Sequence, residues 1–312
     1  MKISDVLGCV GWAAFVLIAS ALVPFFGPFF SLLAPLPFLY YSTKLSFYQG
    51  VKLAAVATLA IALFAKLSGH PEIILFCVEF SFLGLFLSVL FKKKFSLGQT
   101  VLFATGFMLS LAFGFLLFLA LSKGMGPIEM MTGYLKAQLS ANIHAYEEMG
   151  ISQQNAMELE AYGKVFVDAI SKIYPSLMIV GTGLAVWLNI ILAKPLFRKG
   201  NLEYPQFSPM DRWQAPEILV WGVIVSGFAL FLASGSIRLL AVNVLIVLMF
   251  VYLFQGLSIV LFFLNKYKVP TWMRFGIYFL MIIQQLFLAI MTLAGLFDQW
   301  VDFRKIHKKT ES

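Results

Sequence analysis

Long apolar blocks separated by short polar segments dominate the sequence. Each block has 17–26 residues with almost no charge, and about 20 apolar residues form a helix that crosses the hydrocarbon layer of a bilayer. The pattern therefore predicts an all-α, polytopic integral membrane bundle of eight or nine transmembrane helices. The expected spans are residues 8–26, 51–67, 73–91, 98–121, 173–193, 217–233, 239–264 and 275–297, with a shorter apolar piece at 29–41.

The short piece at 29–41 has a broken pattern. Pro35 and Pro37 interrupt it, and Pro24 and Pro28 separate it from the first span. Proline lacks the backbone N–H and clashes with the preceding turn, so a continuous helix is not expected here. Two alternatives remain: a short tilted span, or a re-entrant element that protein or a watery cavity covers.

The stretch 122–172 carries charge throughout and has a helical period. Pro127 is a favourable first helical residue, and apolar residues then recur at three- and four-residue spacing up to a stop at Gly150. Ser152 can cap a second helix, which runs towards a junction with the next span at Pro175. We expect a pair of amphipathic helices that either lie on the lipid interface or cover an outward-facing cavity.

Composition supports a membrane location. The chain is 61% hydrophobic and 12% charged, with a mean hydropathy of +0.89, whereas soluble domains are roughly 45–50% apolar and 25% charged. The net charge of +8 is typical of Lys and Arg retained in cytoplasmic loops, so it does not indicate a nucleic-acid partner. The lipid bilayer is the partner that these values predict.

The basic residues predict an orientation in the inner membrane. The three lysines at 92–94 form the densest cluster and are expected in the cytoplasm. Counting spans from this cluster places the N-terminus in the cytoplasm and the stretch 122–172 outside. The side of the C-terminus stays open, because the basic loop 266–274 and the basic tail cannot both be cytoplasmic if the last span crosses once. Either the tail violates the rule or one segment within 217–264 does not cross.

These expectations divide the chain into four parts. Residues 1–195 form a six-span membrane module that includes the external insertion 122–172. Residues 196–216 form a cytoplasmic linker, residues 217–297 a three-span C-terminal segment, and residues 298–312 a charged tail.

Glu79 is the clearest ionisable residue within a span. It lies six residues below the external end of its span, hence about 9 Å deep at 1.5 Å per residue. Charged groups are costly in a membrane, so such a residue is a functional candidate by default. Glu79 is either a protonated or hydrogen-bonded carboxyl that holds helices together, or an acid that faces a pocket and contacts a substrate or proton.

Other polar and small residues within the spans favour helix packing. The amides of Asn189, Asn243 and Gln255 are expected to join helices by hydrogen bonds worth roughly 1 kcal/mol each. Small residues recur every four positions in the span 98–121, at Gly106, Ser110 and Gly114. This spacing lets two helices approach closely.

Residues for catalysis are scarce. The chain lacks a glycine-rich phosphate loop that ends in Lys-Ser/Thr, so it is not expected to be an ATPase, and its histidines show no paired metal spacing. Asp298 and Asp302 lie one helical turn apart, with Arg304 after them. They either form a charged helix end at the membrane surface or hold a metal with the phosphates of a substrate. The first alternative is the expected one, and we predict no catalytic residue, no metal site and no cofactor.

The sequence resembles the YybS-like family, a group of uncharacterised bacterial multi-span membrane proteins. The resemblance rests on Trp213-x-x-Pro216, on Asn243 before an apolar run to Gln255-Gly256, and on Gly295-x-x-Asp298-x-x-x-Asp302-Phe303-Arg304. The Pro-Leu-Pro at 35–37 is also similar, so the resemblance covers nearly the whole chain. It implies a bacterial inner-membrane location and carries no established activity.

Residues 1–195 are similar, more distantly, to the substrate-binding subunits of energy-coupling-factor vitamin transporters and to MreD-like cell-shape proteins. In the vitamin subunits the pocket opens outward near the first external turn and the outer halves of spans four to six. The similarity therefore implies a ligand site at Glu79, Pro24, Pro28 and Tyr174, and partner subunits that supply energy. The Ala-x-x-x-Ala docking motif of those subunits is missing from the first span, a departure that weighs against the transporter role.

Taken together, these features predict a membrane subunit that binds a small solute or lipid-like molecule and acts with partner proteins. The alternative is a membrane scaffold for cell-envelope or cell-shape proteins. A third possibility is a lipid-modifying enzyme, which requires Asp298 and Asp302 to converge with another acidic or basic residue.

Overall fold

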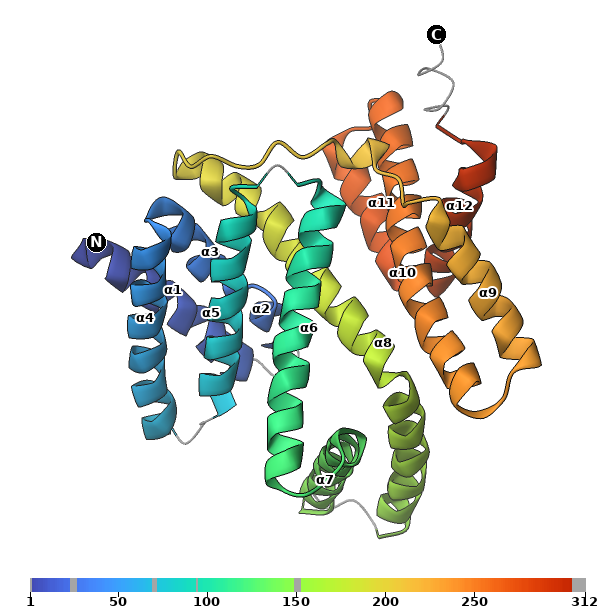
Figure 1. Ribbon diagram of the computed structural model, residues 1–312, viewed down its shortest axis with the longest axis horizontal. Helices are drawn as coiled ribbons and strands as arrows, with labels where there is room; N and C mark the ends of the chain where they lie inside the picture. Colours follow the sequence, from blue (N-terminus) through green and yellow to red (C-terminus); the bar gives the residue numbers. More distant parts are fainter. Residues whose placement is uncertain (1, 23–26, 69–71, 94, 149–152, 305–312) are drawn as a thin grey trace. The chain divides into compact units, whose positions relative to one another are not determined.

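The computed structural model describes residues 2–22, 27–68, 72–93, 95–148 and 153–304, and every regular element in these ranges is a helix (Figure 1). The expected all-α class is confirmed. The elements are α1 (Ile3–Leu22), α2 (Gly27–Ser31), α3 (Pro35–Lys44), α4 (Phe47–Ser68), α5 (Glu72–Leu90), α6 (Leu97–Ser122), α7 (Pro127–Glu148), α8 (Gln153–Lys199), the short 3-10 helix η1 (Met210–Arg212), α9 (Ile218–Leu232), α10 (Gly235–Lys266), α11 (Thr271–Ile283) and α12 (Gln285–Val301).

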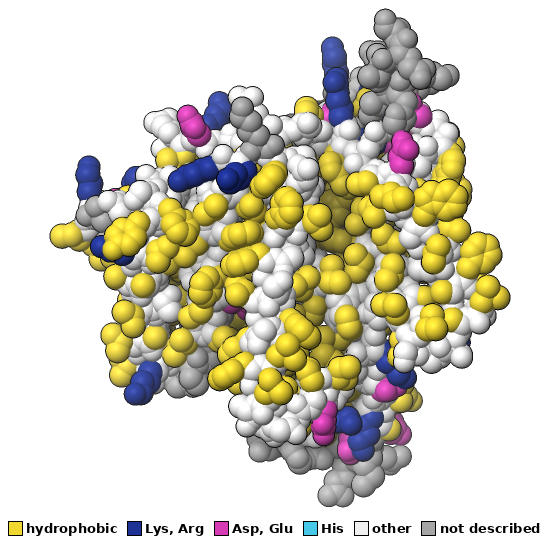
Figure 2. Space-filling model, in the orientation of Figure 1, with side chains coloured by type: hydrophobic (Ala, Val, Ile, Leu, Met, Phe, Trp, Pro, Cys, Tyr) yellow, Lys and Arg dark blue, Asp and Glu magenta, His cyan; other side chains and the backbone are white. Residues whose placement is uncertain are grey.

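Within the described ranges, six helices are long and apolar enough to cross a membrane: α1, α4, α5, α6, α8 and α10. The count rises to seven if α11 and α12 together make one span. Hydrophobic side chains are spread over most of the visible face in the space-filling view (Figure 2). A soluble protein would not expose so much apolar surface. The membrane class is therefore supported, but the expected eight or nine spans are not confirmed.

The lower count has a geometric cause. The apolar piece 29–41 is shared between α2 and α3, and the ten-residue α3 is only about 15 Å long at 1.5 Å per residue. The 15-residue α9 is about 22 Å long, shorter than a hydrocarbon layer of ~30 Å. The expected span 275–297 is split between α11 and α12, which bend by 99°. Apolar composition does not reveal these breaks, because the residues on both sides of each break are apolar.

Internal contacts divide the chain into two compact units. Unit 1 contains Met1–Phe113 and Gly181–Phe207, and unit 2 contains Gly114–Val180 and Ser208–Ser312. The divisions fall within α6 and within α8, so the whole polar stretch 122–172 is grouped with the C-terminal helices. The boundaries expected from the sequence, at 195, 216 and 297, group this stretch with the N-terminal spans and remain a prediction.

Unit 1 is built around the short helix α3. Gly84 on α5 lies so close to α3 that an added Cβ would come within 2.5 Å of Phe38 Cβ and 2.8 Å of Leu39 N. The surrounding core is formed largely by small side chains of α1, α4 and α5, including Cys9, Ala13, Ala57, Ala65 and Cys77. Lys44 at the end of α3 forms a 2.6 Å ion pair with Asp5 at the start of α1. The end of α3 therefore lies beside the start of α1.

Aromatic rings fix the segment after α8 to unit 1. Tyr204 and Phe207 pack edge-on against Phe91, with ring centroids 5.6 and 6.2 Å apart, and Phe91 contacts Phe197 of α8 at 5.7 Å. The Tyr204 hydroxyl donates to the Ile190 carbonyl at 2.8 Å. Pairs of this geometry contribute roughly 0.5–1.5 kcal/mol each beyond burial. This part of the expected linker 196–216 is therefore packed onto helices.

The central helix of unit 2 is α10, which packs against α9, α12 and η1. Gly256 and Gly295 bring the backbones of α10 and α12 into direct contact. A Cβ on Gly256 would collide with the Met291 carbonyl, and a Cβ on Gly295 would collide with the Tyr252 carbonyl. In Figure 1, η1, the end of α10, the start of α11 and the end of α12 all lie at the same end of this unit.

The expected amphipathic pair corresponds to α7 and the first part of α8, which meet where Leu139 packs on Gly163. The expected junction at Pro175 is not a break, because α8 continues through it as one helix of 47 residues. The expected stop at Gly150 and cap at Ser152 lie outside the described residues. The long α8 thus joins the amphipathic stretch directly to a membrane span.

Candidate functional sites

A buried ion pair lies at the end of α12. Arg304 Nη2 donates to Asp298 Oδ2 at 2.7 Å, and both side chains are fully buried. Asp302 ends the helix in the left-handed conformation, at φ 44°, which aspartate tolerates better than most residues. Asp298 and Arg304 are therefore buried within the protein, and the expected charged helix end at the membrane surface stays a prediction. The two charges neutralise each other, so neither needs to face water.

Arg304 also holds the segment that precedes α9. Its Nη1 donates to the carbonyls of Asp211 and Trp213, both at 3.0 Å, and to Ser258 Oγ at 2.7 Å. Ser258 Oγ in turn lies 2.6 Å from the Met210 carbonyl. Buried carbonyls need donors, and a guanidinium supplies several from one side chain. One arginine therefore joins α12, α10 and η1.

Gln255 contacts the ion pair from α10. Its Nε2 donates to Asp298 Oδ2 at 3.1 Å, and its Oε1 accepts the Ala215 N–H at 3.1 Å. Gln299 Nε2 donates to the Ala215 carbonyl at 3.1 Å. We call Gln255, Ser258, Asp298, Gln299 and Arg304 the polar cluster of unit 2.

The chemistry of the polar cluster favours a structural role. Asp298 accepts from Arg304 and Gln255 through Oδ2 and from the Phe303 N–H, at 3.0 Å, through Oδ1. Both carboxylate oxygens are therefore already engaged. Across the described ranges, no three His, Cys, Asp or Glu side chains gather as metal ligands. The arrangement gives no support for a phosphate-binding metal at Asp298 and Asp302.

Asp211 connects two basic segments of unit 2. Its carbonyl accepts from Arg304 at 3.0 Å, and its Oδ2 accepts from Asn265 Nδ2 at 2.9 Å. Asn265 Oδ1 accepts from Arg274 Nη1 at 2.8 Å. The loop between α10 and α11 and the chain after α12 therefore meet on the same short segment before α9.

Asn243 of α10 bonds to α8 beside Pro175. The Ser176 N–H donates to Asn243 Oδ1 at 2.9 Å, and Asn243 Nδ2 donates to the Lys172 carbonyl at 2.8 Å. Ser176 and Lys172 are four residues apart, so their N–H and carbonyl would pair with each other in an unbroken α-helix. One amide thus serves both backbone groups at a point where proline disturbs the helix.

Asn189 donates hydrogen bonds to backbone carbonyls in unit 1, one of them in an irregular segment. Its Nδ2 lies 2.7 Å from both the Leu32 and the Ala185 carbonyls, and the residue is fully buried. Leu32 lies in the connection between α2 and α3, where the carbonyls lack a regular helical partner. Irregular backbone at membrane depth is tolerated when protein groups satisfy it in this way.

Glu79 lies on α5 in unit 1 and is partly buried. No hydrogen bond or ion pair reaches its carboxylate from the portion of the chain that the structure describes. A role as a hydrogen-bonded tie between helices therefore has no support from these contacts. Its role in ligand binding stays a prediction.

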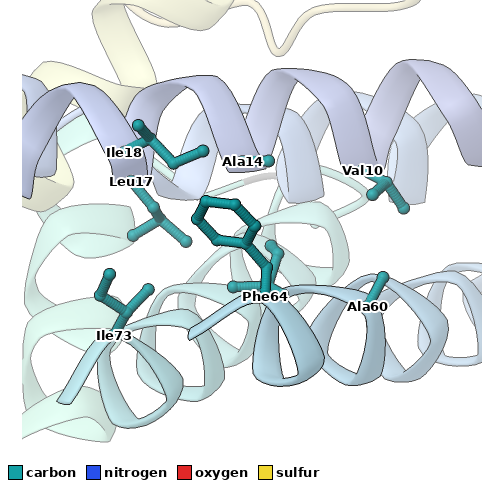
Figure 3. Close-up of a pocket in the computed structure, with 8 residues that line it drawn as sticks. Val10, Ala14, Leu17, Ile18, Ala60, Phe64 and Ile73 are labelled. Atoms are coloured by element: carbon teal, nitrogen blue, oxygen red, sulfur yellow. The ribbon is translucent and has the colours of Figure 1, made fainter. Parts of the chain in front are cut away.

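A cavity of 170 Å³ lies between α1 and α4 in unit 1 (Figure 3). The lining is entirely apolar and consists of Val10, Ala14, Leu17, Ile18, Ala60, Ile61, Phe64 and Ile73. In Figure 3 the Phe64 ring stands between the two helices, near Leu17. Glu79 follows Ile73 by six positions on α5, which places it about 120° around the helix. The structure does not bring Glu79 into this cavity.

The other residues of the expected ligand site are spread along the chain. Pro24 lies outside the described residues, and only the backbone of Pro28 is described, within α2. Tyr174 belongs to unit 2, whereas Glu79 belongs to unit 1. A ligand site that joins these four residues remains a prediction.

The small-residue stripe of α6 faces outward. Gly106, Ser110 and Gly114 are all exposed, and a Cβ added to either glycine would meet nothing within 4 Å. Close packing at this stripe is therefore not seen within either unit. Close packing occurs instead at Gly84 against α3 and between Gly256 and Gly295. The positions of Gly256 and Gly295 within their helices give no repeated small-residue pattern.

The sequence interpretation missed Ser258, Gln299 and Asp211 as members of one polar network. A signal for two of them was present. Ser258 lies three positions after Gln255, and Gln299 follows Asp298, so two apolar helices each carry a local group of polar residues. Polar groups on one face of an apolar helix need partners, and two such helices can supply them to each other.

Comparison with known proteins agrees with the apolar helical architecture. Residues 12–299 match the profile of a family described as "Predicted membrane protein (DUF2232)". The "Uncharacterized protein YybS" of Bacillus subtilis (strain 168) is 22% identical over 289 residues, which cover 90% of this chain and 90% of the relative. No solved structure gives a significant match. Because the family match extends from α1 almost to the end of α12, the chain belongs to this YybS-like family of membrane proteins.

Proposed function

We propose that the protein is a multi-pass membrane subunit that binds a lipid-like molecule in unit 1 and acts with partner proteins. The observation that carries this proposal is the 170 Å³ cavity between α1 and α4, whose lining is wholly apolar. Apolar cavities of about 150 Å³ stay dry and admit hydrocarbons. The cavity therefore fits a segment of a hydrocarbon chain.

The size of the cavity favours a lipid tail over a whole vitamin or another drug-sized solute. Pockets for such ligands measure roughly 300–1,000 Å³ and place a few polar groups among apolar ones. This cavity is smaller, at 170 Å³, and no polar side chain lines it. A molecule whose hydrocarbon tail enters the cavity while its polar head stays outside fits both the small volume and the apolar lining.

Photolabelling in lipid nanodiscs tests the proposal. A phospholipid with a diazirine near the end of one acyl chain is added at low mole fraction, and the adducts are mapped by mass spectrometry. We expect more labelling at Ala14 and Ala60 than at Leu102 and Phe113, which are 68% and 57% exposed but line no part of the cavity.

Two substitutions on α4 separate cavity binding from general lipid contact. Ala60→Phe fills the cavity and is expected to reduce labelling around Ala14 severalfold. Ala55→Phe adds the same group at an exposed position of the same helix and leaves that labelling unchanged. If labelling follows side-chain exposure alone in all three proteins, the cavity is not a binding site.

The partner proteins require a separate measurement. The sequence has no phosphate loop of its own, so any ATP-driven step depends on another chain. A pull-down from native membranes identifies the partners. Recovery of ATPase subunits supports a role in transport, whereas recovery of cell-envelope proteins alone supports the scaffold alternative instead.

We also propose an orientation in the inner membrane. The N-terminus, the segment before α9, the loop between α10 and α11 and the C-terminal tail are cytoplasmic, and the stretch 122–172 is external. The ion pair between Lys44 and Asp5 supports a return of the chain to the side where α1 begins. The bonds from Asp211 to Arg304 and to Asn265 support a common side for both basic segments.

The bend between α11 and α12 lets the basic loop 266–274 and the basic tail both be cytoplasmic. With an angle of 99° between the two helices, the chain can enter the membrane and return to the side from which it came. Both basic segments then obey the preference of Lys and Arg for the cytoplasm. In this arrangement the chain changes sides eight times, with the short helices α3 and α9 in two of the passes, and the bent pair α11 and α12 does not cross.

A further inference from the structure

We infer that Asn243 is a clamp that holds a hinge in α8 at Pro175. The inference rests on two hydrogen bonds in unit 2. Ser176 N–H donates to Asn243 Oδ1 at 2.9 Å, and Asn243 Nδ2 donates to the Lys172 carbonyl at 2.8 Å. The amide thus bonds to the N–H and to the carbonyl that would pair with each other in a regular helix.

The position of Pro175 explains why this bond needs help. Proline offers no N–H to the carbonyl four residues before it, here Ser171, and its ring pushes against that carbonyl. A proline in the interior of a helix kinks it. The next bond along would join Lys172 to Ser176, and both of these backbone groups hydrogen-bond to Asn243. Kinks of this kind are stable where a side chain inserts into the ladder of backbone bonds. Asn243 makes this insertion from α10.

Lys172 is the last residue of the external stretch and Ser176 lies at the start of the span that follows, so the clamp lies where α8 enters the membrane. A backbone group that loses its helical partner on the lipid side of this point has no water to replace it. Asn243 Nδ2 also lies 2.9 Å from the Leu239 carbonyl of its own helix, which orients the amide. Both freed groups of α8 are satisfied by a single side chain that is already held in place.

The hinge controls the orientation of the amphipathic stretch. The part of α8 before Pro175 packs on α7 through Gly163 and Leu139, so the two helices move together. While Asn243 is bound, this pair keeps one direction relative to α10. When the amide releases, Pro175 still disturbs the helix, but the direction of the part before it is no longer fixed. The device therefore has a clamped state with one direction and a released state in which that direction varies.

A double-mutant cycle between the two residues tests the clamp. Asn243→Ala is expected to shift the unfolding equilibrium by about tenfold towards the unfolded state, because two interhelical hydrogen bonds are lost. In a Pro175→Ala background the backbone bond forms directly, so the same substitution should shift the equilibrium threefold or less. Asn189→Ala, which also removes an amide bound to carbonyls, is the matched control and should show no coupling to Pro175.

Pulsed electron resonance measures the movement itself. Nitroxide labels at Val165→Cys on α8 and Phe231→Cys on α9 occupy exposed positions of unit 2, while Cys9 and Cys77 are buried. We expect one narrow distance distribution in the parent protein and a broader or shifted one with Asn243→Ala. Pro175→Ala should give a second narrow distribution, shifted from the first, that Asn243→Ala no longer alters.

Each outcome decides the question. Coupling in the cycle together with a changed distance distribution supports the clamp. Equal costs of Asn243→Ala in both backgrounds overturn it, and so does a distance distribution that Asn243→Ala leaves unchanged. If Asn243→Ala alone does not fold, folding of the double variant with Pro175→Ala supports the clamp, and failure of the double variant overturns it.

Discussion

Arg304 makes more bonds in unit 2 than an ion pair requires. Besides Asp298, it binds two carbonyls before α9 and the hydroxyl of Ser258. Removing charges from water is costly, and the cost is recovered only when geometry and additional hydrogen bonds are good. Here Nη1 and Nη2 make those bonds and fix the chain around Arg304, while Nε is buried with no partner among the described residues. At the residue scale, the pair is an organising contact of unit 2.

Arg304→Gln is expected to destabilise the protein by about 3–5 kcal/mol, because Asp298 stays buried without its counter-charge. Unfolding in mixed micelles with increasing SDS measures the change. Lys164→Gln is the matched control, since Lys164 pairs with Glu160 on the surface, with side chains 67% and 48% exposed. The control substitution should lower the free energy of unfolding by no more than about 1 kcal/mol. A loss for Arg304→Gln no larger than the control would contradict a structural role for the buried pair.

The identities of the polar residues could be read from the sequence, but their partners could not. Gln255, Asp298 and Arg304 stand out in apolar surroundings, so they were recognised as candidates. Their pairing depends on α10 and α12 crossing at a particular height, and no local pattern encodes that height. Asp298 was therefore expected at the surface, although its charge is neutralised inside.

At the element scale, two glycines determine how closely α10 and α12 approach. Without side chains at Gly256 and Gly295, backbone atoms of the two helices touch. Helices in membranes associate through such close packing, because the hydrophobic effect gives little preference for another helix over lipid. The contact also sets the height at which Gln255 reaches Asp298.

Gly256→Ala is expected to lower the free energy of unfolding by about 1–3 kcal/mol, because the new methyl group collides with rigid backbone. The same unfolding measurement applies. Gly227→Ala on α9 is the control, since its added Cβ would meet nothing within 4 Å. That change should stabilise by roughly 0.5–1 kcal/mol, because alanine favours helix more than glycine does. Equal effects of the two substitutions would argue against close packing at Gly256.

The number of crossing helices illustrates a limit of hydropathy at this scale. The predicted spans agree within a few residues with α4, α5, α6 and α10, whereas α8 begins 20 residues before the predicted span 173–193. The short α3 and the bent pair α11 and α12 were not predicted, because apolar residues serve equally well in a span, in a buried short helix and in a re-entrant element. Proline at 35 and 37 did mark the first of these, but no proline or glycine marks the break at Gln284.

At the scale of the whole molecule, the proposed orientation depends on contacts within each unit. The pair Lys44 and Asp5 groups two chain segments at one end of unit 1. Asp211 groups the two basic segments at one end of unit 2. Both groupings agree with an arrangement in which all the basic segments face the cytoplasm.

Cysteine labelling checks this orientation. In a variant without Cys9 and Cys77, single cysteines at Lys268→Cys and Ser312→Cys should react with a membrane-impermeant maleimide from the cytoplasmic side only. Ser234→Cys, at the other end of the 32-residue α10, should react from the outside only. Labelling of Ser312→Cys and Lys268→Cys from opposite sides would mean that α11 and α12 cross the membrane.

The sequence by itself determined that this is an all-helical membrane protein of the YybS-like family, and which polar residues lie within its spans. Hydropathy and period are local properties, so they carry over directly into helices and membrane preference. Only the tertiary structure decided that Asp298 and Arg304 are buried together, that α8 continues through Pro175 with Asn243 bound to it, and that Glu79 lies away from the apolar cavity. These facts depend on contacts between residues more than 40 positions apart, or on the rotation of a helix within its packing. The local sequence pattern encodes neither.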